Sequence, residues 1–417
     1  MTSTTTNSEN PTAAVPRTIT VDTFAVAQQC YRNRDLRQGS YDEGDVVMSD
    51  VLINLHGAEH RNRRRLENRL FRRDTFWHYE QDLFPAIFTE TLAPHLAAGR
   101  TELVRFSHQL MMNLAALTAG VDRREGTPEE TFRLYDYLML FIEGATIAHH
   151  TGDKAAKTAE VAGALAAFGE EFLSPGIERR RAILDRVAAG EAPESDLPPD
   201  VLSVLVRNQD NLDLTPEIIC REVAFYMLAG AHTSATAFTR AMHNIFTWLE
   251  QHPEAAEQPR TDRLFCQRAT HETIRLQPSS PVAVRWAEAD FELADGTPVR
   301  TGDKVVIDLP TVNRDPAVFG DDADGFNPLR EVHDGAHPWG LSFGMGMHAC
   351  IGQDLAAGVV LDPGSELGGH LFGVTPVAVQ TMFDHGCIPD PDDPPEMDPS
   401  TTRPYFGRYP VIFTLRT

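Results

Sequence analysis

The chain has few cysteines and no long hydrophobic run. Its five cysteines are scattered over 417 residues, which is neither the density nor the pairing of a disulfide framework. No apolar segment approaches the ~20 residues that span a bilayer, and the polar first residues lack the charged-then-apolar layout of a secretory signal. We therefore expect a cytoplasmic protein with reduced thiols that does not insert into membranes.

Basic residues are also scarce relative to acidic ones. The sequence holds 37 Lys and Arg residues against 60 Asp and Glu, which gives a formal net charge of −23. This balance favours solubility and argues against general binding to nucleic acid or anionic lipid. The segment 60–73 is a local exception because it holds seven arginines. Such a patch suits docking of an acidic electron carrier, with nucleic acid as the alternative partner.

What the chain does contain is helical periodicity. Between residues 60 and 300, apolar residues recur at three- and four-residue spacing. A long helix is predicted from residue 216 onward, with Thr215 as its N-cap and Pro216 in its first turn. After Pro278 the short runs PVAVRWA, DFEL and KVVIDL are typical of strands. We predict a mainly α fold with a small β-rich part. It forms a single domain, residues 18–417, preceded by a flexible tail, residues 1–17.

The stretch FGMGMHACIG, residues 343–352, places Cys350 behind two closely spaced glycines. A lone cysteine thiolate can be the axial ligand of haem iron. The glycines would let the backbone approach a porphyrin. A helix predicted over residues 350–361 would lower the pKa of the thiol with its positive end. The residues alone leave two alternatives open: a buried free cysteine in a turn, or a structural zinc ligand with only histidines as partners.

This stretch closely resembles the haem-binding loop of the cytochrome P450 family, whose pattern is F-G-x-G-x-H-x-C-x-G. Further signatures of the family occur in the right order, so the resemblance covers roughly residue 45 to the C-terminus. It implies a cytochrome P450 fold with a long central helix over haem b, and Cys350 as the iron ligand. The matching residues are Phe343, Gly344, Gly346, His348, Cys350 and Gly352.

Four positions match residues that bind the haem propionates in this family. His60 and Arg64 are four residues apart and share one helix face. Arg285, in PVAVRWA, and His348, in the haem loop, match two further propionate contacts. Propionates need cationic or hydrogen-bonding partners, which these side chains supply. From the residues alone, Arg285 could equally be a solvated strand arginine.

Glu272 and Arg275, in HETIRL, resemble the E-x-x-R pair of the family. That pair locks its helix to a coil segment before the haem loop through a further Arg or His. The segment 313–316 and the later FNPLR resemble this coil. Taken alone the two residues would be an ordinary surface pair, whereas the resemblance implies a buried structural lock.

The stretch AGAHTSATA, residues 229–237, resembles the pattern A-G-x-[DE]-T-[TS]. The resemblance implies that Thr233 activates oxygen, and that Ala229 and Gly230 leave room for the cofactor. His232 stands where the family usually has an acid. We expect it to relay protons and to shift the pH profile toward the histidine pKa of about 6.5. The residue-level alternatives are a small-residue helix crossing and a histidine packed against a neighbouring helix.

The resemblance implies a monooxygenase that hydroxylates a hydrophobic small molecule with O₂. A separate ferredoxin and ferredoxin reductase would supply electrons, since the chain carries neither a dinucleotide-binding GxGxxG nor a ferredoxin-type cysteine cluster. Two alternatives remain: non-hydroxylating oxidation, such as phenol coupling, peroxide-driven chemistry or rearrangement, and a haem sensor or carrier. Relative to the family, the N-terminal β segment looks short and the break at residues 362–364 is unusual. The predicted substrate contacts are the helix of the 140s and Tyr226, Met227, Val282 and Ala283.

Overall fold

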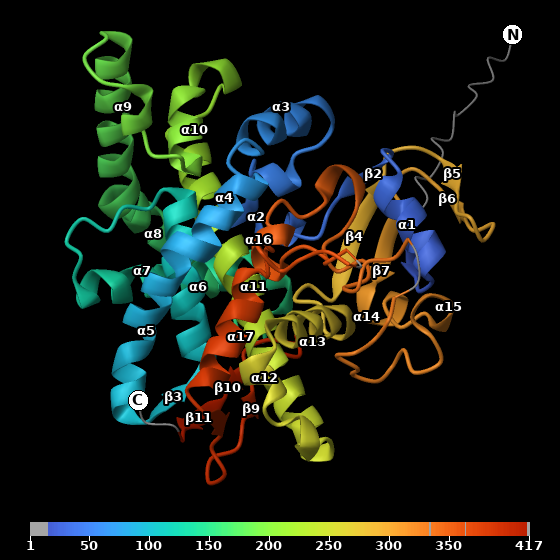
Figure 1. Cartoon of the computed structure of the whole chain (residues 1–417). Coiled ribbons are helices and arrows are strands. Elements are labelled where there is room, and N and C mark those ends of the chain that lie inside the picture. Colours follow the sequence, from blue (N-terminus) through green and yellow to red (C-terminus); the bar gives the residue numbers. More distant parts are fainter. Residues whose placement is uncertain (1–15, 333–334, 363, 415–417) are drawn as a thin grey trace, which may run out of the picture.

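The computed structural model describes residues 16–332, 335–362 and 364–414. Figure 1 shows a large helical body beside a smaller part in which strands and short helices mix. The prediction of a mainly α chain with a small β-rich part is confirmed. The longer helices are α1 (Phe24–Arg32), α3 (Gly57–Glu67), α4 (Arg73–His78), α5 (Phe84–Ala98), α6 (Leu103–Ala119), α7 (Pro128–Ala145), α8 (Lys154–Phe168), α9 (Ser174–Ala188), α10 (Val201–Arg207), α11 (Pro216–Gln251), α13 (Arg263–Leu276) and α17 (Val374–Asp384).

The short helices and the strands make up the connections and the β-rich part. The short helices are α2 (Asp45–Met48), α12 (Gln258–Thr261), α14 (Leu309–Val312), α15 (Pro316–Phe319) and α16 (Gln353–Ala357). The strands are β1 (Thr18–Val21), β2 (Leu36–Gln38), β3 (Arg100–Glu102), β4 (Val282–Ala287), β5 (Phe291–Glu292), β6 (Pro298–Val299), β7 (Lys304–Asp308), β8 (Cys387–Pro389), β9 (Glu396–Met397), β10 (Phe406–Arg408) and β11 (Pro410–Phe413).

Helix α11 runs through the middle of the molecule (Figure 1). It starts as predicted, with the Thr215 hydroxyl accepting a hydrogen bond from the Ile218 N–H at 3.3 Å and Pro216 in the first turn. It continues for 36 residues without interruption, including through Gly230. Most of its sequence is buried because other helices pack against it on several sides.

The N-terminal segment contributes more β-structure than the sequence suggested. A four-stranded sheet has the order β1-β7-β4-β2, in which β1 runs parallel to β7 and β2 antiparallel to β4. Strands β1 and β2 hold four and three residues, and the prediction that this segment is short relative to the family stays a prediction. Residues 1–15 of the predicted tail, residues 1–17, lie outside the described residues. Arg17 is held in place, since its Nη2 lies 2.6 Å from Oδ2 of Asp303.

The helix predicted over residues 350–361 is much shorter than expected. Helix α16 begins at Gln353 and ends at Ala357, because Gly358 adopts a left-handed φ of +74°. Asp362 and Gly364 lie in the loop that follows, whereas Pro363 lies outside the described residues. The break in the helix therefore comes before the residues to which the sequence assigned it.

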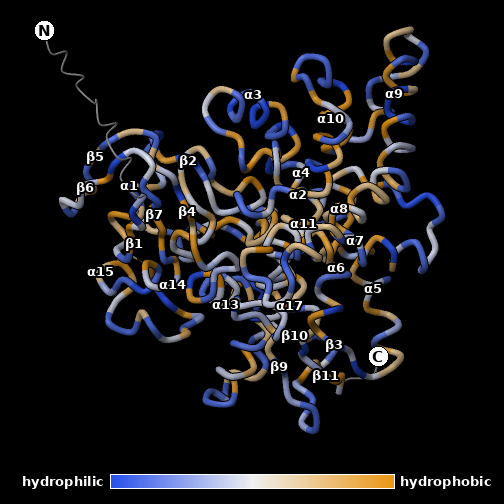
Figure 2. The backbone as a smooth tube through the Cα atoms, turned by 180° about the vertical axis from the view of Figure 1, so that it is seen from behind, coloured by the Kyte–Doolittle hydropathy of each residue, from blue (hydrophilic) through white to orange (hydrophobic). Residues whose placement is uncertain are grey.

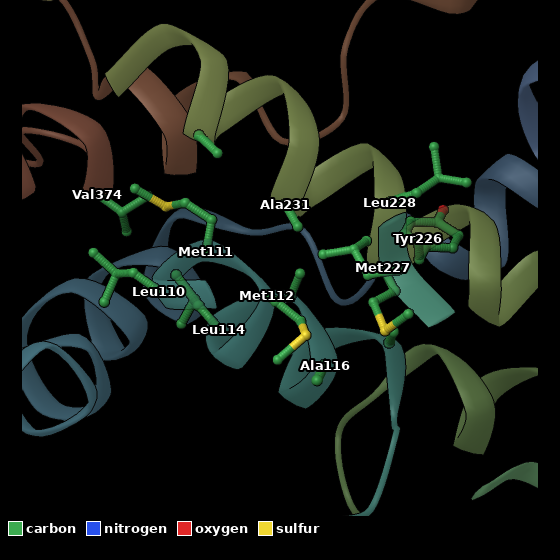
Figure 3. Close-up of a cluster of buried hydrophobic side chains, with 14 of the residues drawn as sticks. Leu110, Met111, Met112, Leu114, Ala116, Tyr226, Met227, Leu228, Ala231 and Val374 are labelled. Atoms are coloured by element: carbon green, nitrogen blue, oxygen red, sulfur yellow. The ribbon is translucent and has the colours of Figure 1, made fainter. Parts of the chain in front are cut away.

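The main hydrophobic core is centred on the contact between α6 and α11. Figure 3 shows Met112 and Ala116 of α6 on the side that faces Met227 and Ala231 of α11. These residues belong to one continuous cluster of buried apolar side chains. Figure 2 shows the contrasting case of α3, whose backbone tube is largely blue because its sequence is hydrophilic. Among the residues that the structure describes, none of the helices combines the length and the apolar character of a membrane span.

Candidate active site

The loop around Cys350 is shaped by two left-handed glycines. Gly344 and Gly346 have φ of +65° and +67°, a region that side chains with a Cβ rarely adopt. A Cβ on Gly346 would lie only 2.7 Å from the carbonyl oxygen of Tyr31, so the loop packs directly on α1. The N–H of Cys350 donates to the carbonyl of Phe343 at 2.8 Å, which closes the loop. The glycine positions are therefore required by the backbone.

Cys350 is exposed, although many protein atoms surround its sulfur. This partial enclosure raises the pKa of the Cys350 thiol, while the N–H of Gly352 and the charge of Arg64 act in the opposite direction. The predicted lowering of this pKa by a following helix is therefore wrong, since α16 is short and begins only at Gln353. Binding of a metal cation would be what removes the proton.

A zinc site at Cys350 would need further metal-ligating side chains close to its sulfur. In the described ranges, no group of three or more His, Cys, Asp or Glu side chains is arranged to hold a metal ion. The zinc alternative therefore finds no partners for Cys350 among these residues.

His60, which is buried, and His348, which is half-buried, form a pair beside the loop. Their ring centroids lie 4.3 Å apart. Both ring nitrogens of His60 and Nε2 of His348 are buried without a hydrogen-bond partner in the described structure. Burial, followed by nearby positive groups, lowers the pKa of His60 to about 4 and that of His348 to about 3. Both rings are therefore neutral at pH 7 and each retains one N–H for an incoming acceptor.

Two arginines complete this basic cluster. Arg64 Nη2 donates to the carbonyl of Ala349 at 2.8 Å, which fastens α3 to the residue before Cys350. Arg285 is buried and bonds the Gln38 side chain at 2.9 Å; its guanidinium lies 5.2 Å from the centre of the Tyr31 ring. Within the described ranges, neither arginine meets a carboxylate. Unpartnered nitrogens and uncompensated buried charge fit a doubly anionic group, as haem with its two propionates is.

Glu272 and Arg275 form a buried pair. Their side chains make two hydrogen bonds of 2.7 Å, and Arg330 of the FNPLR segment adds a third cationic contact, at 3.0 Å from Glu272. Arg275 also donates to the carbonyl of Asn313 at 2.6 Å. The Asn313 side chain in turn accepts from the Leu341 N–H at 2.8 Å, so this network holds the chain that leads into the cysteine loop.

One face of α11 is open in the middle of the helix. Gly230 and Thr233 are exposed there, whereas Ala231 and Ser234 are buried. The Thr233 hydroxyl donates to the carbonyl of Ala229 at 2.7 Å. A Cβ on Gly230 would lie 3.1 Å from Cβ of Ala115, so Gly230 also allows the close approach of α6. Helix α11 therefore has an open face and also, at Gly230, the small-residue crossing with α6 that the sequence left as an alternative.

The open face of α11 is connected to the Cys350 loop. Ala237, one turn after Thr233, belongs to a small buried cluster with Ile274 and Trp339, against which Phe343 of the loop packs. The ring centroids of Trp339 and Phe343 lie 5.5 Å apart. Helix α11 and the loop are therefore held against each other by apolar contacts.

His232 points away from this face and pairs with His108 of α6. Nδ1 of His108 lies 2.9 Å from the carbonyl of Val104, which can only accept, so this nitrogen carries the hydrogen. Nε2 of His108 then accepts from Nδ1 of His232 at 3.1 Å. Nε2 of His232 is left as a buried acceptor with no partner among the described residues. The tautomer of His232 thus follows from the pairing.

The electrostatics of His232 differ from the expectation. Burial, then His108 and the charges of Arg403 and Arg240, lowers the pKa of His232 well below its usual value. The predicted titration near 6.5 is therefore displaced toward lower pH. His232 is neutral through the physiological range and offers one free acceptor.

The residues predicted to contact substrate lie in other surroundings. Met227 is fully buried in the main core. Tyr226 is buried as well, and its hydroxyl donates to Oε2 of Glu67 at 2.5 Å. Val282 and Ala283 lie on β4, with Ala283 in the second hydrophobic cluster. We do not propose Tyr226 and Met227 as substrate contacts, because their surfaces are already covered.

Sequence reasoning missed the buried polar partners of these residues. Glu67 and Glu222 are fully buried in the helical body, and Arg63 pairs with Glu222 at 2.9 Å. His108 and Tyr31 were likewise not singled out. Each of these contacts joins segments far apart in the chain, so no local spacing could indicate them.

The described residues thus bring together a long central helix, a glycine-shaped cysteine loop and a basic cluster that meets no carboxylate among them, an arrangement that fits a haem-thiolate protein. A family model described as cytochrome P450 matches residues 156–358. The chain is 34% identical over 191 residues to cytochrome P450 105C1 of a Streptomyces species, which covers 45% of this chain and 44% of that protein. It is 29% identical over 157 residues to the biotin biosynthesis cytochrome P450 of Bacillus subtilis (38% and 37% covered). The chain spans less than half the length of the curated relatives it matches.

Solved structures with the same fold cover nearly the whole chain. The structure of CalO2 matches with a TM-score of 0.71 at 20% identity, covering 95% of this chain and 91% of that one. The LnmA cytochrome P450 hydroxylase of the leinamycin pathway of Streptomyces atroolivaceus matches with a TM-score of 0.69 at 23% identity (94% and 90% covered). The family model, the relatives and the shared fold together support a cytochrome P450, a family whose members bind haem b.

Proposed function

We propose that this protein is a haem-thiolate monooxygenase that inserts one oxygen atom from O₂ into a hydrophobic small molecule. The observation that carries the proposal is the meeting of Cys350 with the pair His60–His348 and with Arg64 at one loop. When bound, haem supplies the oxygen-cleaving chemistry, and a thiolate ligand favours that cleavage. The protein supplies the sulfur, the orientation and the protons.

The roles of the side chains follow from their contacts. The sulfur of Cys350 would hold the iron, while His60, His348, Arg64 and Arg285 would bind the propionates in a buried setting where each contact is strong. The glycines and Phe343 keep the loop close-packed, so that the cysteine stays in place.

Proton handling is assigned to α11. Thr233 has an exposed hydroxyl that already donates to Ala229, and it can hold a water on the open face. His232 would receive protons at Nε2, since its Nδ1 is committed to His108. A histidine in place of an acid keeps the proton acceptor but removes a permanent negative charge.

Electrons would come from a separate ferredoxin and its reductase in the cytoplasm. The arginines of α3, of the turn after it and of the start of α4 support this, because several are exposed and meet no carboxylate within the described ranges. A small acidic electron carrier would be steered to such a surface. These residues are Arg61, Arg65, Arg69, Arg72 and Arg73.

The test is the origin of the oxygen in the product. The purified holoenzyme is combined with a surrogate ferredoxin, its reductase and NADPH, and a panel of apolar compounds is turned over under ¹⁸O₂. We expect one ¹⁸O atom in the product, and none when the label is in water. Unlabelled product would favour non-hydroxylating oxidation. This alternative is suggested by the histidine at position 232, where the family usually has an acid. Haem that binds gas reversibly without any turnover would favour a sensor or carrier.

A further inference from the structure

A cavity of about 190 Å³ lies beside α11, about 100° around the helix from the open face that carries Thr233. The Tyr405 hydroxyl, in the cavity wall, donates to the carbonyl of Ser279 at 2.6 Å. The Ser279 hydroxyl donates to the carbonyl of Thr233 at 2.9 Å, so the wall is tied to the turn that carries Thr233. The walls come from α6, α7, α11 and the segment 398–407, and include His108, Tyr135, Met139, Ile142, His232 and Arg240.

Two buried arginines lie near the ring of Tyr405: Arg240 lines the cavity, whereas Arg403 is next to Tyr405 but not among the lining residues. The guanidinium carbons of Arg240 and Arg403 lie 5.1 and 5.9 Å from the centre of the Tyr405 ring. Arg240 bonds only backbone carbonyls, those of Gln277, Pro278 and Pro404. Arg403 donates to the Tyr405 hydroxyl at 2.8 Å, and its Nε is buried with no partner among the described residues. Among the described residues, neither Arg240 nor Arg403 forms an ion pair with a carboxylate.

The acidic residues of the cavity are already engaged. Glu102 caps α6 by accepting from the N–H groups of Val104 and Arg105. Glu143 pairs with Lys157 at 2.6 Å. Asp398 accepts from the N–H and the hydroxyl of Ser400. None of these carboxylates forms an ion pair with Arg240 or Arg403.

The other buried arginines show what this absence means. Arg63, Arg180 and Arg275 are each neutralised by a buried carboxylate, as a charge removed from water requires. The buried Arg285 meets none, and it is the arginine assigned to a haem propionate. Burial without a bound anion also lowers the pKa of Arg240 to about 10. A buried arginine without a carboxylate in this protein is thus a position where an anion is expected from outside the chain.

We propose that this cavity binds the carboxylate of an otherwise apolar small molecule, held by the positive charges of Arg240 and Arg105 in its wall and of Arg403 beside Tyr405. A guanidinium matches a carboxylate in geometry as well as charge. The side chains of Tyr135, Met139 and Ile142 offer an apolar wall for the rest of the molecule. That the bound acid is the substrate rests on the proposed monooxygenase function; the binding itself does not.

The experiment compares two probes of equal length and shape, octanoate and octanamide, which differ in charge at pH 7.5. Binding to the purified holoenzyme is measured by isothermal titration calorimetry. We expect octanoate to bind about ten-fold more tightly than octanamide, the ratio typical of one charge-assisted contact. Arg403→Gln should abolish that preference and leave octanamide binding within about two-fold. Arg300→Gln is the matched control, because Arg300 is exposed and pairs only with the exposed Asp290 on the surface.

Equal affinity of the wild-type protein for the two probes would overturn the proposal, and so would a preference that survives Arg403→Gln. Should that variant not fold, Arg105→Gln removes another of these charges. Arg105 is exposed, lines the cavity, and forms no ion pair within the described ranges, although its guanidinium lies over the Phe132 and Tyr135 rings. Arg105→Gln should weaken octanoate binding and not octanamide binding. If the holoenzyme shows thiolate ligation but binds octanoate no better than octanamide, only the proposal of acid binding is refuted. If the purified protein prefers octanoate but contains no haem, only the monooxygenase function proposed above is refuted.

Discussion

Glu67 and Glu222 are two carboxylates buried side by side in the helical body. Glu222 accepts from the N–H of Leu52 and pairs with Arg63, whereas Glu67 accepts only from the Tyr226 hydroxyl. Burial raises the pKa of Glu222 to about 7. Burial, and then repulsion from Glu222, raises the pKa of Glu67 well above its usual value. The folded protein therefore carries a proton on Glu67 that the unfolded chain releases above pH 4.5.

This makes the contribution of Glu67 to stability depend on pH in a known direction. A raised pKa in the folded state stabilises the fold at low pH, and the benefit is lost as the pH rises above the unfolded value. Glu67→Gln is neutral at every pH, so we expect its stability relative to wild type to increase from pH 5 to pH 8. Urea denaturation at both values measures this. Glu254→Gln, at an exposed position, is the control. Equal pH dependence in wild type and Glu67→Gln would contradict the assignment.

The second prediction at this scale concerns His232. His232→Ala removes the free acceptor at Nε2, so the share of electrons recovered as product should fall about ten-fold, the order of a lost proton-transfer group. Haem content and the absorption spectrum should not change. In the wild type this share should be flat between pH 6.5 and 8, since the pKa of His232 is lowered well below 6.5. Unchanged coupling in His232→Ala, with the exposed His78→Ala as control, would remove the relay role.

At the scale of elements, the segment after α16 forms a loop that closes on itself. The chain leaves α16 at Gly358 and reaches α17 through Gly373, with φ of +74° and +91°. A Cβ on Gly373 would lie 2.3 Å from the N atom of Gly358, so the two ends of the loop touch. We call this contact between Gly358 and Gly373 the neck of the loop. Nε2 of Gln267 lies 3.0–3.4 Å from four carbonyl oxygens at the neck, and Glu80 accepts a hydrogen bond from the N–H of Gly373.

The neck can be tested with a matched pair of substitutions. Gly373→Ala forces a Cβ into backbone atoms and should destabilise the protein by several kcal/mol. Gly369→Ala has a similar φ of +76° but meets nothing within 4 Å, so it should cost only about 1 kcal/mol. Urea denaturation of both variants measures the difference. Equal losses would show that the neck is not closely packed.

The sequence predicted the long helix and the central strands well, because their signals are local. Thr215 and Pro216 mark the start of α11, and PVAVRWA and KVVIDL contain β4 and β7. It did not predict β1, β2 or the early end of α16. The two strands are short and pair with residues more than two hundred positions away, and α16 ends because a glycine meets a distant backbone.

At the scale of the whole molecule, the candidate site was predictable in its residue types. The motif supplied Cys350, His348 and the glycines, and the structure places His60, Arg64 and Arg285 around them. The partners that set their properties were not predictable. Burial lowers the pKa values of the histidines, and the helix expected to lower the pKa of Cys350 is short. Such effects depend on surroundings assembled from distant segments.

The most direct measurement is the absorption spectrum of the reduced, carbon monoxide-bound holoenzyme, recorded for the wild type and for Cys350→Ser. Thiolate ligation through Cys350 predicts a red-shifted Soret band in the wild type. The substitution should abolish that band, because serine offers no comparable sulfur donor. A purified protein without haem, or a red-shifted band that persists in Cys350→Ser, would contradict the account.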